Sequence, residues 1–136
     1  MSTLSLANIE SKAANTPPVI KDSNGTEVGQ FCRAWVNFNG EASTAVIRDY
    51  FNVSSITDEA AGDYTVNFTN PMSNADYCVS GGAADTATGA GYRWLAVGSA
   101  YESNFSKTVN GVRVQPAYAS ANKYQAAQVY VVIHGN

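Results

Sequence analysis

The side chains with the greatest capacity for chemistry are the acidic residues between positions 49 and 63. Asp58, Glu59 and Asp63 lie close together, and Asp49 precedes them. Two carboxylates could act as the acid and base of a glycosidase, and a group of carboxylates could bind calcium. However, the run lacks the ligand spacing and the glycine of a calcium loop. We therefore interpret residues 58–63 as a solvated acidic turn and predict no metal or cofactor.

Other catalytic signatures are also lacking in this sequence. His134 is the only histidine, and it follows an apolar run close to the last residue. A single histidine at this place gives no zinc cluster and no credible catalytic triad. Gly89 and Gly91 resemble part of a nucleotide-binding loop but lack its third glycine and the following helix. The sequence predicts a protein that is not an enzyme.

A group of aromatic residues in the second half of the chain is a candidate for binding. These residues are interspersed with Ser, Asn and Gln, and such a mixture can stack on sugar rings while forming hydrogen bonds to their hydroxyl groups. The same residues could instead fill the core or a subunit interface. The candidate glycan-binding residues are Tyr92, Trp94, Tyr101, Tyr118 and Tyr124, with Phe105 among them.

Composition restricts the classes of partner. The 136 residues suit one domain, and 11 acidic against 8 basic residues give a net charge of -3. Without a basic cluster we expect no nucleic-acid partner, and without a long apolar run we expect no membrane insertion. No secretory signal is recognisable, so we expect synthesis in a cytosol. Cys32 and Cys78 are then expected to be unlinked, buried thiols.

The aliphatic residues favour strands as the elements that position these groups. The chain has 14 Val and 5 Ile against 3 Leu, and β-branched side chains suit pleated strands. Alternating apolar residues and turn signals predict strands at residues 31–38, 45–56, 64–68, 77–80, 92–97, 108–115 and 125–134, with 45–56 either one strand or two joined by a bulge near Asp49. A long loop of small residues is expected at 81–91. The fold class predicted is all-β, an antiparallel β-sandwich of jelly-roll-like type.

The first 30 residues differ from the rest of the chain. They contain no aromatic residue, a Pro17-Pro18 pair and a turn signal at Asn24-Gly25. We interpret residues 1–30 as an extended N-terminal arm and residues 31–136 as the sandwich head. The arm has too few apolar residues for its own core, so we expect it to dock to another protein, or else to fold back on its own head. The residues expected to dock are Leu4, Leu6, Ile9, Val19 and Ile20.

Three ordered motifs within about residues 31–80 resemble a known group of proteins. The motifs are RAWVNFNG at 33–40, VSSIT at 53–57 and GDYTVNF at 62–68. Together they resemble the short β-rich virion proteins and fibre tips of tailed bacteriophages, of the marine and cyanobacterial type, that are called tail-fibre-like. Beyond Gly81 no motif of this group is present.

The resemblance implies a virion structural protein that assembles in the host cytoplasm. It would be a short tail-fibre or spike component, homotrimeric, with its arm docked to other virion proteins and its head in contact with a host surface glycan. One alternative is a capsid or tube decoration protein with no receptor role. A further alternative is a stand-alone carbohydrate-binding module.

Overall fold

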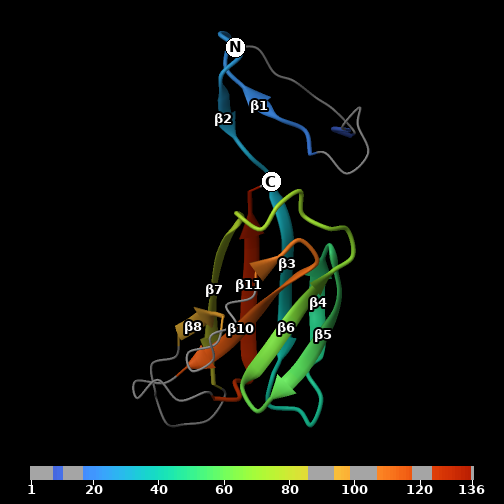
Figure 1. Ribbon diagram of the computed structural model, residues 1–136, viewed down its shortest axis with the longest axis vertical. Helices are drawn as coiled ribbons and strands as arrows, with labels where there is room; N and C mark the ends of the chain where they lie inside the picture. Colours follow the sequence, from blue (N-terminus) through green and yellow to red (C-terminus); the bar gives the residue numbers. More distant parts are fainter. Residues whose placement is uncertain (1–7, 11–16, 86–93, 99–106, 118–123, 136) are drawn as a thin grey trace. The chain divides into compact units, whose positions relative to one another are not determined.

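The computed structural model describes residues 8–10, 17–85, 94–98, 107–117 and 124–135. The chain divides into two compact units, Met1–Phe31 and Cys32–Asn136. Within the described ranges both units contain strands, turns and irregular segments and no helix. The larger unit is an antiparallel β-sandwich, so the predicted fold class is confirmed (Figure 1).

The smaller unit contains a short antiparallel hairpin. Its strands are β1, Ile20–Lys21, and β2, Glu27–Gly29. The Asp22 carboxylate closes the turn because its Oδ1 accepts hydrogen bonds from the backbone N–H groups of Asn24 and Thr26, each at 2.9 Å. Gly25 has a positive φ of 81°, which glycine adopts without strain. The Asn24-Gly25 signal thus marks a real turn, and the arm has more local structure than the extended segment that we expected.

The head consists of two sheets. The first has the strand order β4-β3-β11-β7, and its strands are β3 (Cys32–Asn39), β4 (Val46–Phe51), β7 (Cys78–Ala84) and β11 (Gln128–His134). The second has the order β5-β6-β10-β8 with β9 beside β10, and its strands are β5 (Val53–Ala60), β6 (Asp63–Phe68), β8 (Trp94–Val97), β9 (Lys107–Thr108) and β10 (Gly111–Ala117). Every pairing between described strands is antiparallel.

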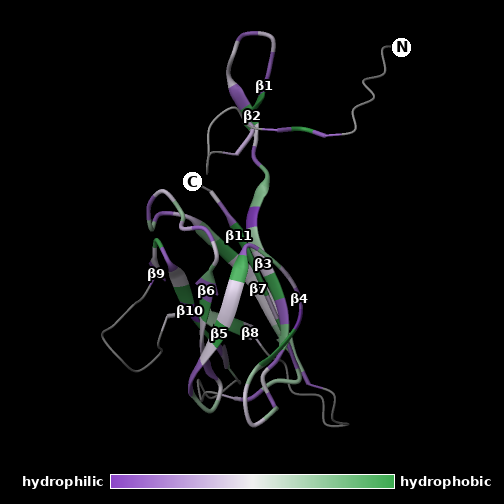
Figure 2. Ribbon diagram, turned by 90° about the vertical axis from the view of Figure 1, so that its right-hand side faces the viewer, coloured by the Kyte–Doolittle hydropathy of each residue, from purple (hydrophilic) through white to green (hydrophobic). Residues whose placement is uncertain are grey.

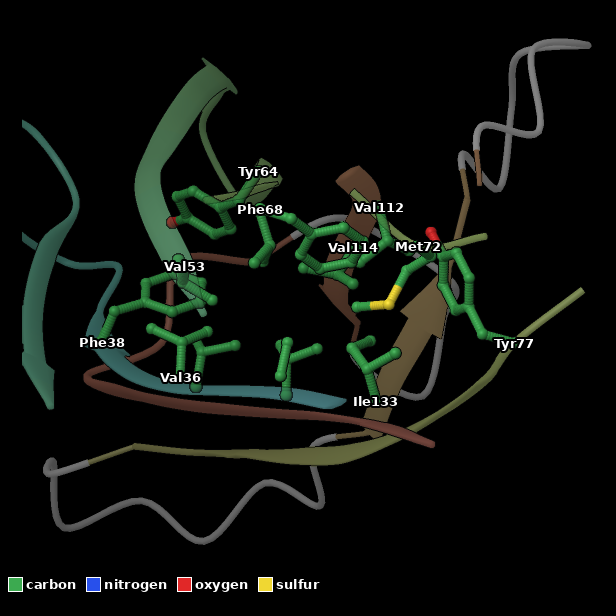
Figure 3. Packing of buried hydrophobic residues seen from close by; sticks show 14 of the residues in the cluster. Val36, Phe38, Val53, Tyr64, Phe68, Met72, Tyr77, Val112, Val114 and Ile133 are labelled. Atoms are coloured by element: carbon green, nitrogen blue, oxygen red, sulfur yellow. The ribbon is translucent and has the colours of Figure 1, made fainter. Parts of the chain in front are cut away.

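The core lies between the two sheets and follows the predicted alternation. Ala34, Val36 and Phe38 point inward from β3, and Tyr64 and Val66 point inward from β6, each with at most 2% of its surface exposed. The Phe38 and Tyr64 rings meet edge to face with centroids 5.1 Å apart, so an aromatic pair joins one sheet to the other. Figure 3 shows Val36, Phe38 and Tyr64 in the packed interior, and Figure 2 shows hydrophobic and hydrophilic residues alternating along the strands.

Asn52 is the corner at which the chain leaves the first sheet for the second. It is the only residue other than glycine with a positive φ among the described residues, at 55°. Its side-chain Nδ2 donates to the carbonyls of Arg33 and Asn70, and its Oδ1 accepts from the Asn70 N–H at 2.8 Å. The expected bulge near Asp49 is also present, because Asn37 pairs with Asp49 while Phe38 pairs with Ile47. Residues 45–56 therefore form two strands, in different sheets.

Three local expectations are wrong. Gly81 and Gly82 do not begin a loop but lie within β7, paired with Val131 and Tyr130. At Gly81 an added Cβ would lie 2.1 Å from the Tyr130 carbonyl oxygen, so glycine is required for close packing there, not for a turn. The expected strand at 108–115 is a short β9, a turn and then β10.

The third wrong expectation concerns the thiols. Both cysteines are free, as expected, but Cys78 is exposed and Cys32 is half-buried. Cys78 pairs with His134, which is itself exposed at the end of β11. Alternation along β7 places Val79 against the core and therefore turns Cys78 away from it.

Candidate functional site

A buried charge cluster replaces the expected acidic turn. Asp63 opens β6 and is fully buried, and the Arg113 guanidinium of β10 binds both of its carboxylate oxygens, with Nε–Oδ1 at 2.7 Å and Nη2–Oδ2 at 2.8 Å. The Gln115 side chain donates a further hydrogen bond to Oδ2 at 2.8 Å. Such a bidentate pair fixes the register of neighbouring strands and occupies the carboxylate. The interpretation of Asp63 as solvated is therefore wrong.

The other acidic residues stand apart from this cluster. Asp58 and Glu59 belong to β5, not to a turn, and Glu59 accepts a hydrogen bond from the Thr65 hydroxyl at 2.7 Å. Both are exposed, as predicted. Asp49 lies on β4 in the other sheet. These four acidic residues of positions 49–63 therefore form no carboxylate pair that faces a common substrate position.

The described residues contain no group of three or more His, Cys, Asp and Glu side chains that could hold a metal ion. The grouping most similar to a set of metal ligands is at His134, which is paired with Cys32 of β3 on one side and with Cys78 of β7 on the other. The Cys32 thiol, however, is directed to backbone carbonyls, those of Ala34 at 3.3 Å and Ile133 at 3.5 Å.

Two of the candidate glycan-binding residues can be placed, and both are exposed at the same strand end. Trp94 of β8 pairs with Ala117, and the Tyr124 N–H donates to the Pro116 carbonyl at 2.9 Å. Their exposed fractions are 44% and 41%, so neither side chain belongs to the core. Tyr92, Tyr101, Phe105 and Tyr118 lie outside the described residues.

The N-terminal unit exposes the described part of its apolar surface. Ile9, Val19, Ile20 and Val28 are each between 45% and 62% exposed. Leu4 and Leu6 lie outside the described residues. These four aliphatic side chains are thus available to a partner.

A second apolar surface, which the sequence analysis missed, lies on β4 of the head. Val46, Tyr50 and Phe51 are each more than half exposed, although they belong to a regular strand. The signal was present in the sequence, because residues 45–51 carry apolar side chains at both odd and even positions. A strand with only one face covered would carry apolar side chains at odd positions or at even positions, but not at both.

Two tyrosines hold the ends of the sandwich together. The Tyr64 hydroxyl donates to the Gly40 carbonyl at 2.6 Å, and the Tyr77 hydroxyl lies 2.9 Å from the Gly111 carbonyl oxygen. Burial is the main cause that raises the pKa of each phenol to about 12, with the Asp58 carboxylate adding to the effect at Tyr64. Both groups are structural, since their hydroxyls are directed to backbone carbonyls in the interior.

Comparison with protein-family models, with curated proteins and with solved structures finds no match for this chain. Among the described residues, no helix is long and apolar enough to cross a membrane. The functional conclusion therefore depends on the surfaces described above and on the motif resemblance.

Proposed function

We propose that this protein is a structural and adhesive component of a tailed-bacteriophage particle. In this proposal its N-terminal unit docks to other virion proteins and its head faces outward as part of a short tail fibre or spike. The role as a virion component, assembled in the host cytoplasm, comes from the resemblance of residues 31–80 to tail-fibre-like proteins. The division into docking and presenting parts comes from the geometry.

The observation that carries the proposal is the contrast in exposure between the two units. The head buries its core completely, whereas Ile9 and Val28 of the N-terminal unit are each 62% exposed. A hairpin of two-residue and three-residue strands is too small to be stable through its own contacts. Such a unit gains stability when a partner covers its apolar side chains, either by strand addition or by side-chain contact.

Substitutions on the hairpin test the docking role. The double variant Ile20→Ser, Val28→Ser should reduce the number of copies in purified particles by about tenfold or more, because it removes two apolar contacts of about 1 kcal/mol each. Lys21→Ser, on the same hairpin, is the matched control and should assemble normally. Normal copy number for the double variant would reject the docking role.

The proposed adhesive surface of the head is the end of β10 where Trp94 and Tyr124 lie. Exposed aromatic rings beside polar groups favour sugar stacking, and loss of one ring should weaken glycan binding about tenfold. Trp94→Ala measured against a panel of bacterial surface glycans, with Tyr130→Ala as a control on an exposed aromatic residue elsewhere on the head, is the appropriate experiment. Particle assembly without any glycan binding would favour a decoration protein instead, and glycan binding by a chain that enters no particle would favour a stand-alone module.

The resemblance implies threefold association, whereas the inference below is a twofold contact. The mass of the full chain in solution decides between these two predictions.

A further inference from the structure

The free edge of β4 has the properties of a contact between two copies of this chain. Among the described strands of the first sheet β4 is the terminal one and pairs with β3 alone (Figure 1). Val46, Tyr50 and Phe51 are 53%, 55% and 53% exposed along it. An exposed edge with large apolar side chains is a template for another strand.

The neighbouring edge strand of the second sheet shows what a protected edge looks like. In β5 the exposed residues are mainly polar or charged, including Ser54, Thr57, Asp58 and Glu59. Such side chains discourage strand addition. The two edges follow each other in sequence on either side of Asn52, so the apolar character of β4 is not a general property of the sandwich edges.

The bulge at Arg48 determines which residues of β4 share a face. Residues directly opposite one another in antiparallel strands point to the same side of the sheet. Ile47 and Tyr50 pair with Phe38 and Val36, so both point to the core side. The core-facing positions are therefore three residues apart, where a regular strand would place them two or four apart.

The outward face of β4 carries the remaining residues. Val46, Asp49 and Phe51 pair with Asn39, Asn37 and Trp35, which alternate with the core residues of β3. The extra residue, Arg48, directs its Nη1 to the Asn37 side-chain oxygen at 3.4 Å and so lies on the same outward face. Arg48 and Asp49 are thus neighbouring opposite charges on one side of the edge.

We propose that two copies of the chain associate about a twofold axis by antiparallel pairing of their β4 edges. In one register Val46 lies opposite Phe51 of the second copy, Ile47 opposite Tyr50, and Arg48 opposite Asp49. Each pair joins residues of the same face, and the charged pair joins opposite charges twice, once on each side of the axis. An isologous contact of this kind is closed after two copies.

Neighbouring registers match neither the faces nor the charges of the paired residues. A slip of one residue in either direction places Arg48 opposite Arg48 or Asp49 opposite Asp49, and it pairs core-facing with outward-facing positions. Like charges directly opposite one another are destabilising. The sequence of β4 and its bulge therefore select a single register.

The Asp49 carboxylate explains how the edge is held in the separate chain. Its Oδ1 accepts a hydrogen bond from the Tyr50 backbone N–H at 2.9 Å. In the proposed pair this carboxylate turns to Arg48 of the second copy, and the Tyr50 N–H becomes available to the opposing strand. The exchange of one hydrogen bond for another predicts a reversible, concentration-dependent dimer.

Charge reversal tests the register directly. Arg48→Asp gives two carboxylates opposite two carboxylates, and Asp49→Arg gives two guanidinium groups opposite two others. Each single variant should raise the dimer Kd by on the order of tenfold or more, because two attractive pairs become repulsive. When the two variants are mixed, every position again faces an opposite charge, so the mixture should form heterodimers with about the wild-type Kd.

The measurement is native mass spectrometry and light scattering of the full chain over a range of micromolar concentrations. We expect a dimer for the wild type and a weaker dimer for each reversal. The mixture and the double swap Arg48→Asp, Asp49→Arg should recover about the wild-type Kd. The surface control Asp76→Arg should leave the Kd unchanged. A wild-type mass of one or three chains would overturn the proposal. Dimers that ignore the reversals, or a mixture that fails to recover while both variants remain folded by circular dichroism, would also overturn it.

If one reversal prevents folding, Phe51→Ser provides a second route. It removes an exposed apolar contact on each side of the axis and leaves the core untouched, so it should raise the dimer Kd by about tenfold. Unchanged dimerisation of this folded variant would contradict the β4 contact. These outcomes concern association alone, so they can fail while particle docking by the N-terminal unit holds.

Discussion

The N-terminal hairpin and the head are both antiparallel β-structures, but they treat their apolar residues in opposite ways. The head turns one face of its longer strands toward a common interior, where Phe38, Val66 and Val131 are almost completely buried. Among the described residues of the N-terminal unit no second layer covers the hairpin of β1 and β2, and Ile20 and Val28 stay exposed. Strand patterning therefore gives an independent fold only where a second sheet covers it.

In the proposed function, this difference separates the part of the chain that provides stability from the part that provides attachment. The head should account for nearly the whole free energy of unfolding of the isolated chain. The hairpin should contribute little to this stability, and its apolar side chains should contribute to binding a partner. Changes in the core should therefore lower stability strongly, and changes in the hairpin should leave it almost untouched.

The largest expected effect comes from the aromatic pair between the sheets. Phe38→Ala should lower the free energy of unfolding by about 4 kcal/mol, because it removes a fully buried ring and leaves a cavity beside Tyr64. Urea denaturation followed by tryptophan fluorescence gives this value. A loss below about 1 kcal/mol would mean that the two sheets do not depend on this contact.

The buried charge cluster should have the next largest effect. Asp63→Asn removes the charge that the Arg113 guanidinium binds at 2.7 and 2.8 Å and should cost about 3 kcal/mol. Glu59→Gln, an exposed acidic residue of the neighbouring strand, is the matched control and should cost less than about 0.5 kcal/mol. Equal effects of the two substitutions would show that the Asp63 cluster is not a special support of the head.

Alkaline pH should weaken the head through its two buried phenols. The pKa of Tyr64 and of Tyr77 is about 12 in the folded state, whereas an exposed tyrosine has a pKa of about 10. The unfolded chain therefore releases these protons at lower pH than the folded chain, so stability is complete below about pH 10 and falls as pH rises toward 12. Urea midpoints measured across this range should decrease, and Tyr77→Phe should show a smaller decrease.

The smallest expected effect is on the hairpin side of the comparison. Ile20→Ser and Val28→Ser should each change the free energy of unfolding of the isolated chain by no more than about 0.5 kcal/mol, because both side chains are already exposed. Differential scanning calorimetry measures this change. A large destabilisation would mean that the hairpin and the head fold as one unit and do not divide into two.

The sequence allowed prediction of the fold class and of the inward faces of two strands because alternation records burial directly. Ala34, Val36 and Phe38 are one such set, and Tyr64, Val66 and Phe68 are another. Asp63 was misjudged because its partners, Arg113 and Gln115, lie about fifty residues later, and no local pattern reveals a pairing at that distance. Local spacing can suggest a turn, but only strand order shows which charges meet.

Glycine and the edge strand illustrate two further limits. Gly81 predicts a loop, yet it lies in β7, where the Tyr130 backbone approaches too closely for any side chain. The apolar residues of β4 predict a strand, but their exposure depends on β4 being the last described strand of its sheet. An apolar residue in a strand is therefore not always a core residue. At the edge of a sheet it can stay exposed in the separate chain and be covered by a second chain.

The most direct test of the division between docking unit and head is the copy number of a chain that lacks residues 1–31 in purified particles. We predict that this head keeps the melting temperature of the full chain to within a few degrees and is absent from the particles. Incorporation of the truncated head at the level of the full chain would contradict the account, because attachment would then reside on the head itself.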